Sequence, residues 1–269
     1  LSADSLANVV TDSTLLVMLA LTQMLVIVTR GVDLSVASSL ALCGMVAAML
    51  GAHYPGLPLA LIMLAAVAVG LGLGLVNGWL IGRLELPPIV VTLGTMSVYR
   101  GAVFVLSGGA WVSAHQMPAH FISFPLDRLL GLPHLVWIAA AALAAMAWVA
   151  RSTRFGRDLY AIGNAPQCAG YIGIPTHKRL LWTYALSGAV AGLCGYLWVA
   201  RYAVAYTEIA YGFEFTVIAA CVIGGVSIGG GVGTVPGALL GALFLGIVNT
   251  ALPVLQITPF WQMAISGAV

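Results

Sequence analysis

The sequence predicts an all-α, polytopic membrane protein, and three observations support this fold class. Hydrophobic residues make up 61% of the chain and charged residues only 7%, whereas soluble domains are about 45–50% apolar and about 25% charged. Several stretches without any charge are long enough for a membrane-spanning helix, which needs roughly 20 residues. Apolar residues also continue for dozens of positions, without the alternation typical of a membrane β-barrel. The composition therefore excludes a soluble enzyme, a nucleic-acid binder and a disordered chain.

Nine apolar segments are expected to enter or cross the membrane. Gaps between charged residues, divided at turn signals, place them at 13–29, 36–52, 57–82, 86–107, 133–150, 180–203, 213–228, 234–252 and 259–269. The chain begins with Leu and stops within an apolar run. We therefore expect residues 1–269 to be a single transmembrane domain truncated at both ends, with about ten spans in the full protein and with broken or re-entrant helices.

The distribution of Lys and Arg predicts the orientation. Short cytoplasmic loops are enriched in these residues, and five of the ten lie between residues 151 and 179. With that loop in the cytoplasm, the loops at Arg30 and at 83–85 are cytoplasmic as well. The loops 53–56, 108–132 and 204–212 are then external, and Arg128 is the one Lys or Arg among them.

Glycines at four-residue spacing predict close helix packing. They occur at Gly70, Gly74 and Gly78, and again in the pairs 188/192 and 237/241. Small residues at this spacing let helix backbones approach closely in lipid.

The first polar interruption is the segment from Arg30 to Val36. Asp33 is suited to cap a helix that starts near Leu34, because a carboxylate accepts the free N–H groups of a first turn. A helix break beside a translocation path, formed by Asp33 and Ser35, is the alternative. The residues alone favour the cap.

The second interruption lies in the span that begins at Pro87-Pro88. This span contains Thr92, Thr95 and Arg100. An arginine within a span is costly in lipid, so it is expected to face the protein interior or water. A structurally paired arginine near the outer interface is an equally good interpretation.

The third feature is a short helix expected within the basic loop, at residues 165–172. Asn164 is a suitable N-cap and Pro166 fits the first turn. Gly173 and Pro175 predict the C-terminal stop. Because so short a helix is marginal in water, it is expected to dock on a partner. Its candidate residues are Asn164, Ala165, Pro166, Ala169, Gly170, Tyr171 and Gly173.

The fourth feature is a glycine-rich stretch, with six glycines among residues 224–233. A regular helix cannot continue through it, and broken backbone at membrane depth must be surrounded by protein or line a cavity. Gly224 and Gly225 mark the expected break. A nucleotide site is not expected, because the Lys-Ser/Thr of a phosphate-binding loop is missing.

Catalytic and metal-binding patterns are absent from the sequence. The four cysteines suggest neither metal spacing nor a disulfide framework. The five histidines lack helical metal spacing with a carboxylate. We therefore expect no catalytic, cofactor or metal site on this chain.

Together these features resemble the permease subunits of bacterial ATP-binding-cassette importers for monosaccharides, the ribose, xylose, galactose and rhamnose group, which also includes autoinducer-2 permeases. The family's Gly-Ile-Asp-Leu-Ser-Val-Gly-Ser motif is similar to residues 31–38, with Ala37 in place of a glycine. Its Thr-Leu-Gly-Thr…Arg-Gly stretch is similar to 92–101. Its Phe-Gly-Arg…Gly-Asn…Gly-Ile loop resembles 153–174, and its glycine run resembles 224–241.

The resemblance implies a permease in the bacterial inner membrane that pairs with a second permease subunit, identical or different. It also implies cytoplasmic ATP-binding subunits, which would bind the ATP, and a periplasmic sugar-binding protein. Residues 165–172 would be the helix that couples the permease to the ATPase. Two other classes remain alternatives: an ion-coupled secondary transporter and an integral membrane transferase.

Overall fold

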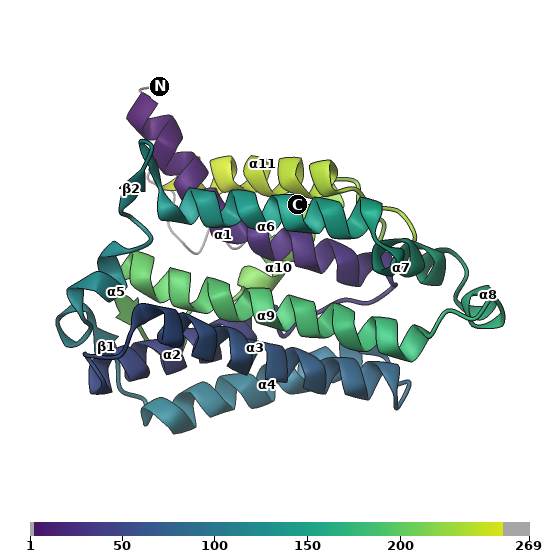
Figure 1. Ribbon diagram of the computed structural model, residues 1–269, viewed down its shortest axis with the longest axis horizontal. Coiled ribbons are helices and arrows are strands. Elements are labelled where there is room, and N and C mark those ends of the chain that lie inside the picture. Colours follow the sequence, from purple (N-terminus) through teal and green to yellow (C-terminus); the bar gives the residue numbers. More distant parts are fainter. Residues whose placement is uncertain (1–2, 255–269) are drawn as a thin grey trace. The chain divides into compact units, whose positions relative to one another are not determined.

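The computed structural model describes residues 3–254 and is mostly helical (Figure 1). Within that range, six helices are long and apolar enough to cross a membrane. They are α1 (Ala3–Val28), α2 (Val36–His53), α3 (Leu59–Gly82), α4 (Pro88–Ser107), α6 (His134–Ser152) and α9 (Thr176–Tyr202). The first six predicted segments are thus confirmed as apolar helices; α1 begins ten residues before its predicted start at residue 13, and the other ends differ by a few residues.

The expectation of nine spans is not confirmed. The segment predicted at 213–228 is the helix α10 (Phe213–Ile223), which has only 11 residues. At 1.5 Å per residue it covers about 16 Å, roughly half of the apolar core of a bilayer. The segment predicted at 234–252 is α11 (Val235–Val254). The ninth segment, 259–269, lies outside the described residues.

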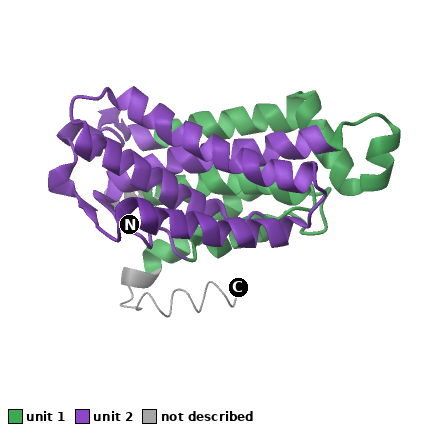
Figure 2. Ribbon diagram, turned by 90° about the horizontal axis from the view of Figure 1, so that it is seen from below, with its two compact units in different colours: residues 1–32, 136–176, 212–269 green, residues 33–135, 177–211 purple. Residues whose placement is uncertain are grey.

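The chain divides into two compact units (Figure 2). Unit 1 contains residues 1–32, 136–176 and 212–269, and unit 2 contains residues 33–135 and 177–211. Unit 1 is therefore built from α1, most of α6, α10 and α11, together with two shorter helices, α7 (Arg154–Asn164) and α8 (Pro166–Tyr171). Helix α1 packs against both α10 and α11.

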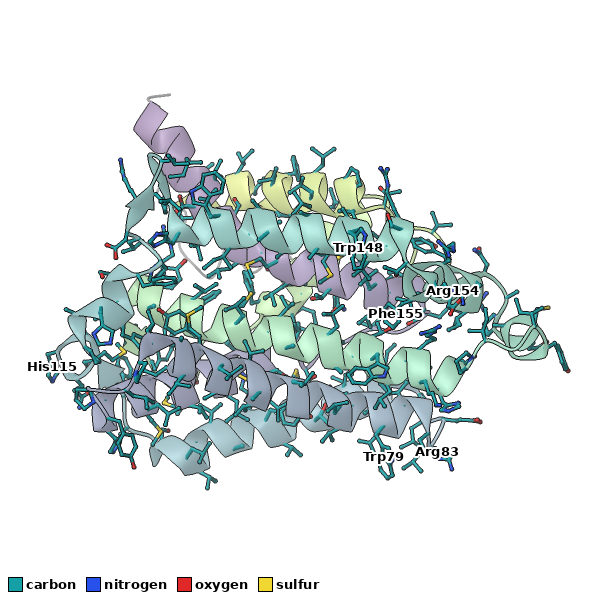
Figure 3. The ribbon with its side chains drawn as sticks, viewed as in Figure 1. Trp79, Arg83, His115, Trp148, Arg154 and Phe155 are labelled. Carbon is teal, nitrogen blue, oxygen red and sulfur yellow. The ribbon has the colours of Figure 1, made fainter. Side chains whose placement is uncertain are left out.

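Unit 2 is built from α2, α3, α4 and most of α9. Its remaining elements are short: β1 (Val112–Ser113), η1 (Ala114–Gln116), α5 (Ala119–Ser123), β2 (Arg128–Leu129), β3 (Leu132–Pro133) and β4 (Val204–Ala205). Strand β1 pairs antiparallel with β4, and β2 pairs antiparallel with β3. His115 lies at one end of this unit, whereas Trp79 and Arg83 lie at the other (Figure 3).

The predicted glycine contacts hold helices together within each unit. In unit 2, a Cβ atom at Gly74 of α3 would overlap the carbonyl oxygen of Tyr184 on α9, and one at Gly188 would overlap the carbonyl oxygen of Gly70. In unit 1, a Cβ atom at Gly241 of α11 would overlap the carbonyl oxygen of Ala220 on α10. These backbones therefore approach as closely as the glycine spacing predicted.

The orientation in the membrane stays a prediction, and cysteine labelling can test it. In a variant without the native cysteines, His115→Cys should react with a membrane-impermeant maleimide in intact cells, because His115 is exposed and lies in the loop predicted to be external. Ser152→Cys is also exposed but should react only after permeabilisation. The reverse pattern would invert the predicted topology.

Candidate functional site

The basic loop folds into a helical hairpin, α7–α8, at one end of unit 1 (Figures 1 and 2). Helix α7 begins after Thr153, whose hydroxyl oxygen accepts a hydrogen bond from the N–H of Gly156 at 3.0 Å. Arg154 and Phe155 form its first turn (Figure 3). Helix α7 was not among the elements expected from the sequence.

Helix α8 confirms the short helix expected at 165–172. It begins at Pro166 and ends at Tyr171. Gly173 follows with φ of +81°, and the N–H of Ile174 donates to the carbonyl oxygen of Ala169 at 3.0 Å. This is the Schellman ending that Gly173 predicted. The chain then continues directly into α9.

Ala169, expected on the docking surface of α8, and Asn164, expected as its N-cap, do not take those places. Ala169 is only 1% exposed, so its methyl group packs inside the protein and cannot contact a partner. Asn164 does not cap α8, because it is the last residue of α7 and Ala165 takes the cap position. The outward surface of the hairpin is instead formed by Tyr171, which is 90% exposed, and Ile172, which is 72% exposed.

The turn that follows α1 has an unusual residue, Arg30, at its left-handed position. The N–H of Arg30 donates to the carbonyl oxygen of Ile27 at 2.9 Å, and that of Gly31 to Val26 at 3.2 Å. This is again a Schellman ending, in which glycine is the preferred residue at the left-handed position. Arg30 occupies that position with φ of +66°, at a cost of about 1–2 kcal/mol relative to an ordinary backbone conformation.

The side chain of Arg30 caps the end of α7. Its Nε donates to the carbonyl oxygen of Gly163 at 2.7 Å, and its Nη2 donates to that of Asn164 at 3.2 Å. These are carbonyls of the last turn of α7, which lack partners within the helix. A guanidinium at a helix C-terminus also interacts favourably with the helix dipole.

The glycine-rich segment meets α1 and α7 at the same place. The N–H of Gly231 donates to the carbonyl oxygen of Val28 at 2.8 Å, and the hydroxyl of Tyr160 donates to the carbonyl oxygen of Gly233 at 2.9 Å. A Cβ atom at Gly163 would overlap the Val28 carbonyl oxygen. We call Arg30, Tyr160, Gly163, Asn164, Gly231 and Gly233 the Arg30 cluster. Burial raises the pKa of Tyr160, so its hydroxyl stays protonated as a donor at neutral pH.

Asp33 lies in a buried polar network in unit 2. Helix α2 starts at Val36, later than predicted, so Asp33 precedes the cap residue Ser35 and does not cap the first turn itself. Its Oδ1 accepts hydrogen bonds from the N–H and the hydroxyl of Ser35, at 2.9 and 2.6 Å. Its Oδ2 accepts one from Ser187 of α9 at 3.3 Å, and Asn77 of α3 donates to the Ser35 hydroxyl at 2.8 Å. The network therefore joins three helices, whereas the predicted cap would have involved only the start of α2.

Burial raises the pKa of Asp33, and the hydrogen bonds from Ser35 and Ser187 oppose this only in part. The folded state thus holds the proton more tightly than the unfolded chain. The stability contributed by the neutral carboxyl is complete below the unfolded pKa and is lost as the pH rises through the folded pKa.

Asp33→Asn should remove this pH dependence, because the amide keeps the shape and the acceptor oxygen without a charge. The melting temperature of the wild type in detergent should fall as the pH is raised from 5 to 9 by more than that of Asp33→Asn. Asp33→Leu should be less stable at every pH, since it leaves the Ser35 N–H and hydroxyl without this acceptor. If the melting temperatures of the wild type and Asp33→Asn changed equally between pH 5 and 9, this would contradict a raised pKa of Asp33.

The polar residues of α4 are bound to backbone groups. Thr92 donates to the carbonyl oxygen of Pro88 at 2.9 Å, and Thr95 donates to that of Val91 at 3.1 Å, both within their own helix. Arg100 donates to the carbonyl oxygen of Ile209 at 2.6 Å and lies over the ring of Tyr211. Of the two interpretations of Arg100, this geometry favours the structurally paired arginine.

Gly224 and Gly225 end helix α10, which confirms the break predicted there. Gly225 has φ of +83°, and the N–H of Val226 donates to the carbonyl oxygen of Cys221 at 3.0 Å. A Cβ atom at Gly224 would overlap the carbonyl oxygen of Gly237. The break therefore needs glycine both for its backbone conformation and for the contact with α11.

Some buried polar groups were not singled out in the sequence. The amide of Gln23 in α1 and the hydroxyl of Tyr184 in α9 are fully buried, with no hydrogen-bond partner among the described residues. Gln23 could have been noticed as an amide within an apolar span. Within residues 3–254 we find no group of three His, Cys, Asp or Glu side chains that could hold a metal ion.

Comparisons with known proteins place these features in a family. The family described as the branched-chain amino acid transport system / permease component matches residues 5–269. The autoinducer 2 import system permease protein LsrC of Shigella flexneri is 35% identical over 269 residues, which are all of this chain and 78% of that protein. LsrC of Salmonella typhimurium is 36% identical over 270 residues, covering all of this chain and 76% of that protein. No solved structure matches the chain significantly. Taken with the six apolar helices, these matches show that the chain is a transport subunit that belongs to the permease-component family.

Proposed function

We propose that this chain is the membrane-spanning permease subunit of an ATP-binding-cassette importer and forms the path for a monosaccharide or a related sugar-like molecule. The observation that carries the proposal is the similarity to autoinducer 2 import permeases along the whole chain. A branched-chain amino acid is the second candidate cargo, because the family description names it. The relatives named above, which are autoinducer 2 import permeases, favour the sugar-like cargo.

The proposed assembly contains two permease subunits, identical or different, in the inner membrane of a bacterium. Cytoplasmic subunits bind the ATP, so this chain needs no cofactor of its own, and a periplasmic binding protein delivers the cargo. The contact of the hairpin α7–α8 with the ATPase is supported by the apolar surface that Tyr171 and Ile172 expose. An exposed aromatic side chain is a frequent anchor in protein interfaces.

The proposed path follows the broken helix α10. Half-length helices and unwound backbone at membrane depth occur where they are surrounded by protein or line a cavity. Gly224 and Gly225 produce this break, and Asp33 and Ser35 remain candidates at the start of α2. Thr92, Thr95 and Arg100 are weaker path candidates, because their polar groups are already bound to backbone carbonyls.

Co-purification and uptake test the proposal together. The full protein that contains this chain should co-purify with an ATP-binding subunit of its own organism. Cells that carry the complete system should take up labelled autoinducer-2 or a labelled monosaccharide, with leucine as the competing cargo. Uptake of leucine alone would support the second candidate. Uptake without an ATPase, driven by a proton gradient, would overturn the proposal in favour of a secondary transporter.

A further inference from the structure

The Arg30 cluster joins three segments of unit 1 that are far apart in the sequence. Arg30 ends α1, Gly163 and Asn164 end α7, and Gly231 lies in the segment between α10 and α11. Hydrogen bonds connect every pair of these segments: Arg30 to Gly163, Gly231 to Val28, and Tyr160 to Gly233. The three segments therefore meet in a closed ring of contacts.

The cluster leaves little room for relative movement of its parts. A Cβ atom at Gly163 would overlap the Val28 carbonyl oxygen and would lie 2.5 Å from the N–H nitrogen of Gly231. A Cβ atom at Gly231 would overlap the side chain of Asn164. Backbones in such contact cannot slide independently, because close-packed atoms resist displacement.

Helix α8 is attached directly to this cluster. Asn164, the last residue of α7, is separated from α8 by Ala165 alone. A displacement of α8 is therefore passed first to the end of α7, and from there to whatever the end of α7 contacts. The segment with Gly231 and Gly233 follows the break that ends α10 and precedes α11.

We infer that the Arg30 cluster transmits movement of the α7–α8 hairpin to α1 and to the α10–α11 break. The inference rests on the proposed docking of α8 to an ATPase. Arg30 and Tyr160 are positioning residues in this account, because they hold the backbone of the other segments and are not assigned to the cargo. A shift of α8 would move the glycine-rich segment as one piece with the end of α7.

The conformation of Arg30 supports a role beyond ending a helix. Glycine would end α1 without backbone strain, as Gly173 does for α8 and Gly225 does for α10. An arginine at this position has a strained backbone. Unlike glycine, it donates two hydrogen bonds to the end of α7. Strain of this kind persists where the surrounding contacts hold it in place.

The test removes the side-chain hydrogen bonds of Arg30 and Tyr160 without adding any atom to the contact. The double variant Arg30→Gly with Tyr160→Phe loses these bonds, and glycine also relieves the strained backbone. The assembled complex with its ATPase is reconstituted in proteoliposomes, and cargo uptake is measured per ATP hydrolysed. We expect a melting temperature close to that of the wild type, normal co-purification of the ATPase, and at least a fivefold lower uptake per ATP.

A pair of glycine variants provides an independent measurement, in which Gly231, with φ of +73°, also has the left-handed backbone that favours glycine. Gly231→Ala introduces a Cβ atom that overlaps Asn164, whereas the Cβ atom of Gly229→Ala would meet only the Ser227 hydroxyl, at 3.5 Å. We expect uptake per ATP to fall in Gly231→Ala and to stay normal in Gly229→Ala. If Gly231→Ala fails to fold, uptake per ATP in the double variant alone decides whether the cluster transmits movement.

The outcomes separate this inference from the proposed function. If the double variant and Gly231→Ala both took up as much cargo per ATP as the wild type, the inference would be overturned and the proposed function would stand. Failure of the wild-type protein to bind any ATPase would overturn the proposed function, and the inference with it.

Discussion

Replacing Tyr171 and Ile172 by aspartate is expected to abolish binding of the ATP-binding subunit while leaving the permease folded. Both side chains are mostly exposed, so their removal costs no internal packing. If they are the anchors of the interface, their loss should cost about 4 kcal/mol, which corresponds to roughly a thousandfold weaker binding. Pull-down of the ATPase from membranes with matched permease levels measures this effect.

A control variant separates docking from the loss of exposed apolar surface in general. Leu130, in the turn between β2 and β3, is 85% exposed and lies in the loop predicted to be external. Leu130→Asp should therefore bind the ATPase normally. Ala169→Arg is not a suitable probe, because it would place a charge on a buried side-chain position of α8. Normal ATPase binding by the Tyr171→Asp, Ile172→Asp variant would show that α8 is not the docking helix.

The second large effect is expected from Gly74→Ala in the contact between α3 and α9. The new methyl group would overlap the Tyr184 carbonyl oxygen and lie 2.9 Å from the Cα of Ala185. Backbone atoms cannot rotate away as a side chain can, so the two helices must separate. We expect a loss of about 3 kcal/mol, or a melting temperature lower by roughly 6–12 °C, measured by fluorescence-detected size exclusion after heating in detergent.

The same helix offers the control. Gly72 is exposed, and a Cβ atom there would meet nothing within 4 Å. Alanine is also the better helix former, so Gly72→Ala should melt at or slightly above the wild-type temperature. Equal melting temperatures for Gly72→Ala and Gly74→Ala would mean that the close contact between α3 and α9 does not limit stability.

The long helices could be predicted from the sequence because charge is expensive in lipid. The charge-free stretch 34–82, divided at the turn around Pro55, predicted α2 almost to the residue, and the glycine spacing predicted close packing of α3. Helix α10 could not be distinguished from a full span in this way. Its residues are as apolar as those of a longer helix, so the charge gap alone extends the segment to residue 228, and only Gly224 and Gly225 indicate the stop after Ile223.

The site residues were predicted less completely, for identifiable reasons. Phe155, Leu159 and Ile162 repeat at helical spacing and could have indicated α7, but they lie in a basic stretch whose charges were interpreted as those of a cytoplasmic loop. Gly173 predicted the end of α8 correctly, since a glycine with a proline two residues later, here Pro175, is a strong local signal. Arg30 could not be predicted to take a left-handed conformation, because the bonds that compensate for it come from residues more than 130 positions away.

The short length of α10 has a consequence for how the chain enters the membrane during synthesis. A helix of 11 residues is too short for the insertion machinery to accept as an independent span, however apolar it is. Its backbone fits against α11 through Gly224, Gly237 and Gly241. Helices α10 and α11 should therefore leave the translocon together as a hairpin. A nascent chain ended after residue 223 would keep α10 outside the bilayer, which glycosylation mapping of ribosome-bound intermediates would reveal.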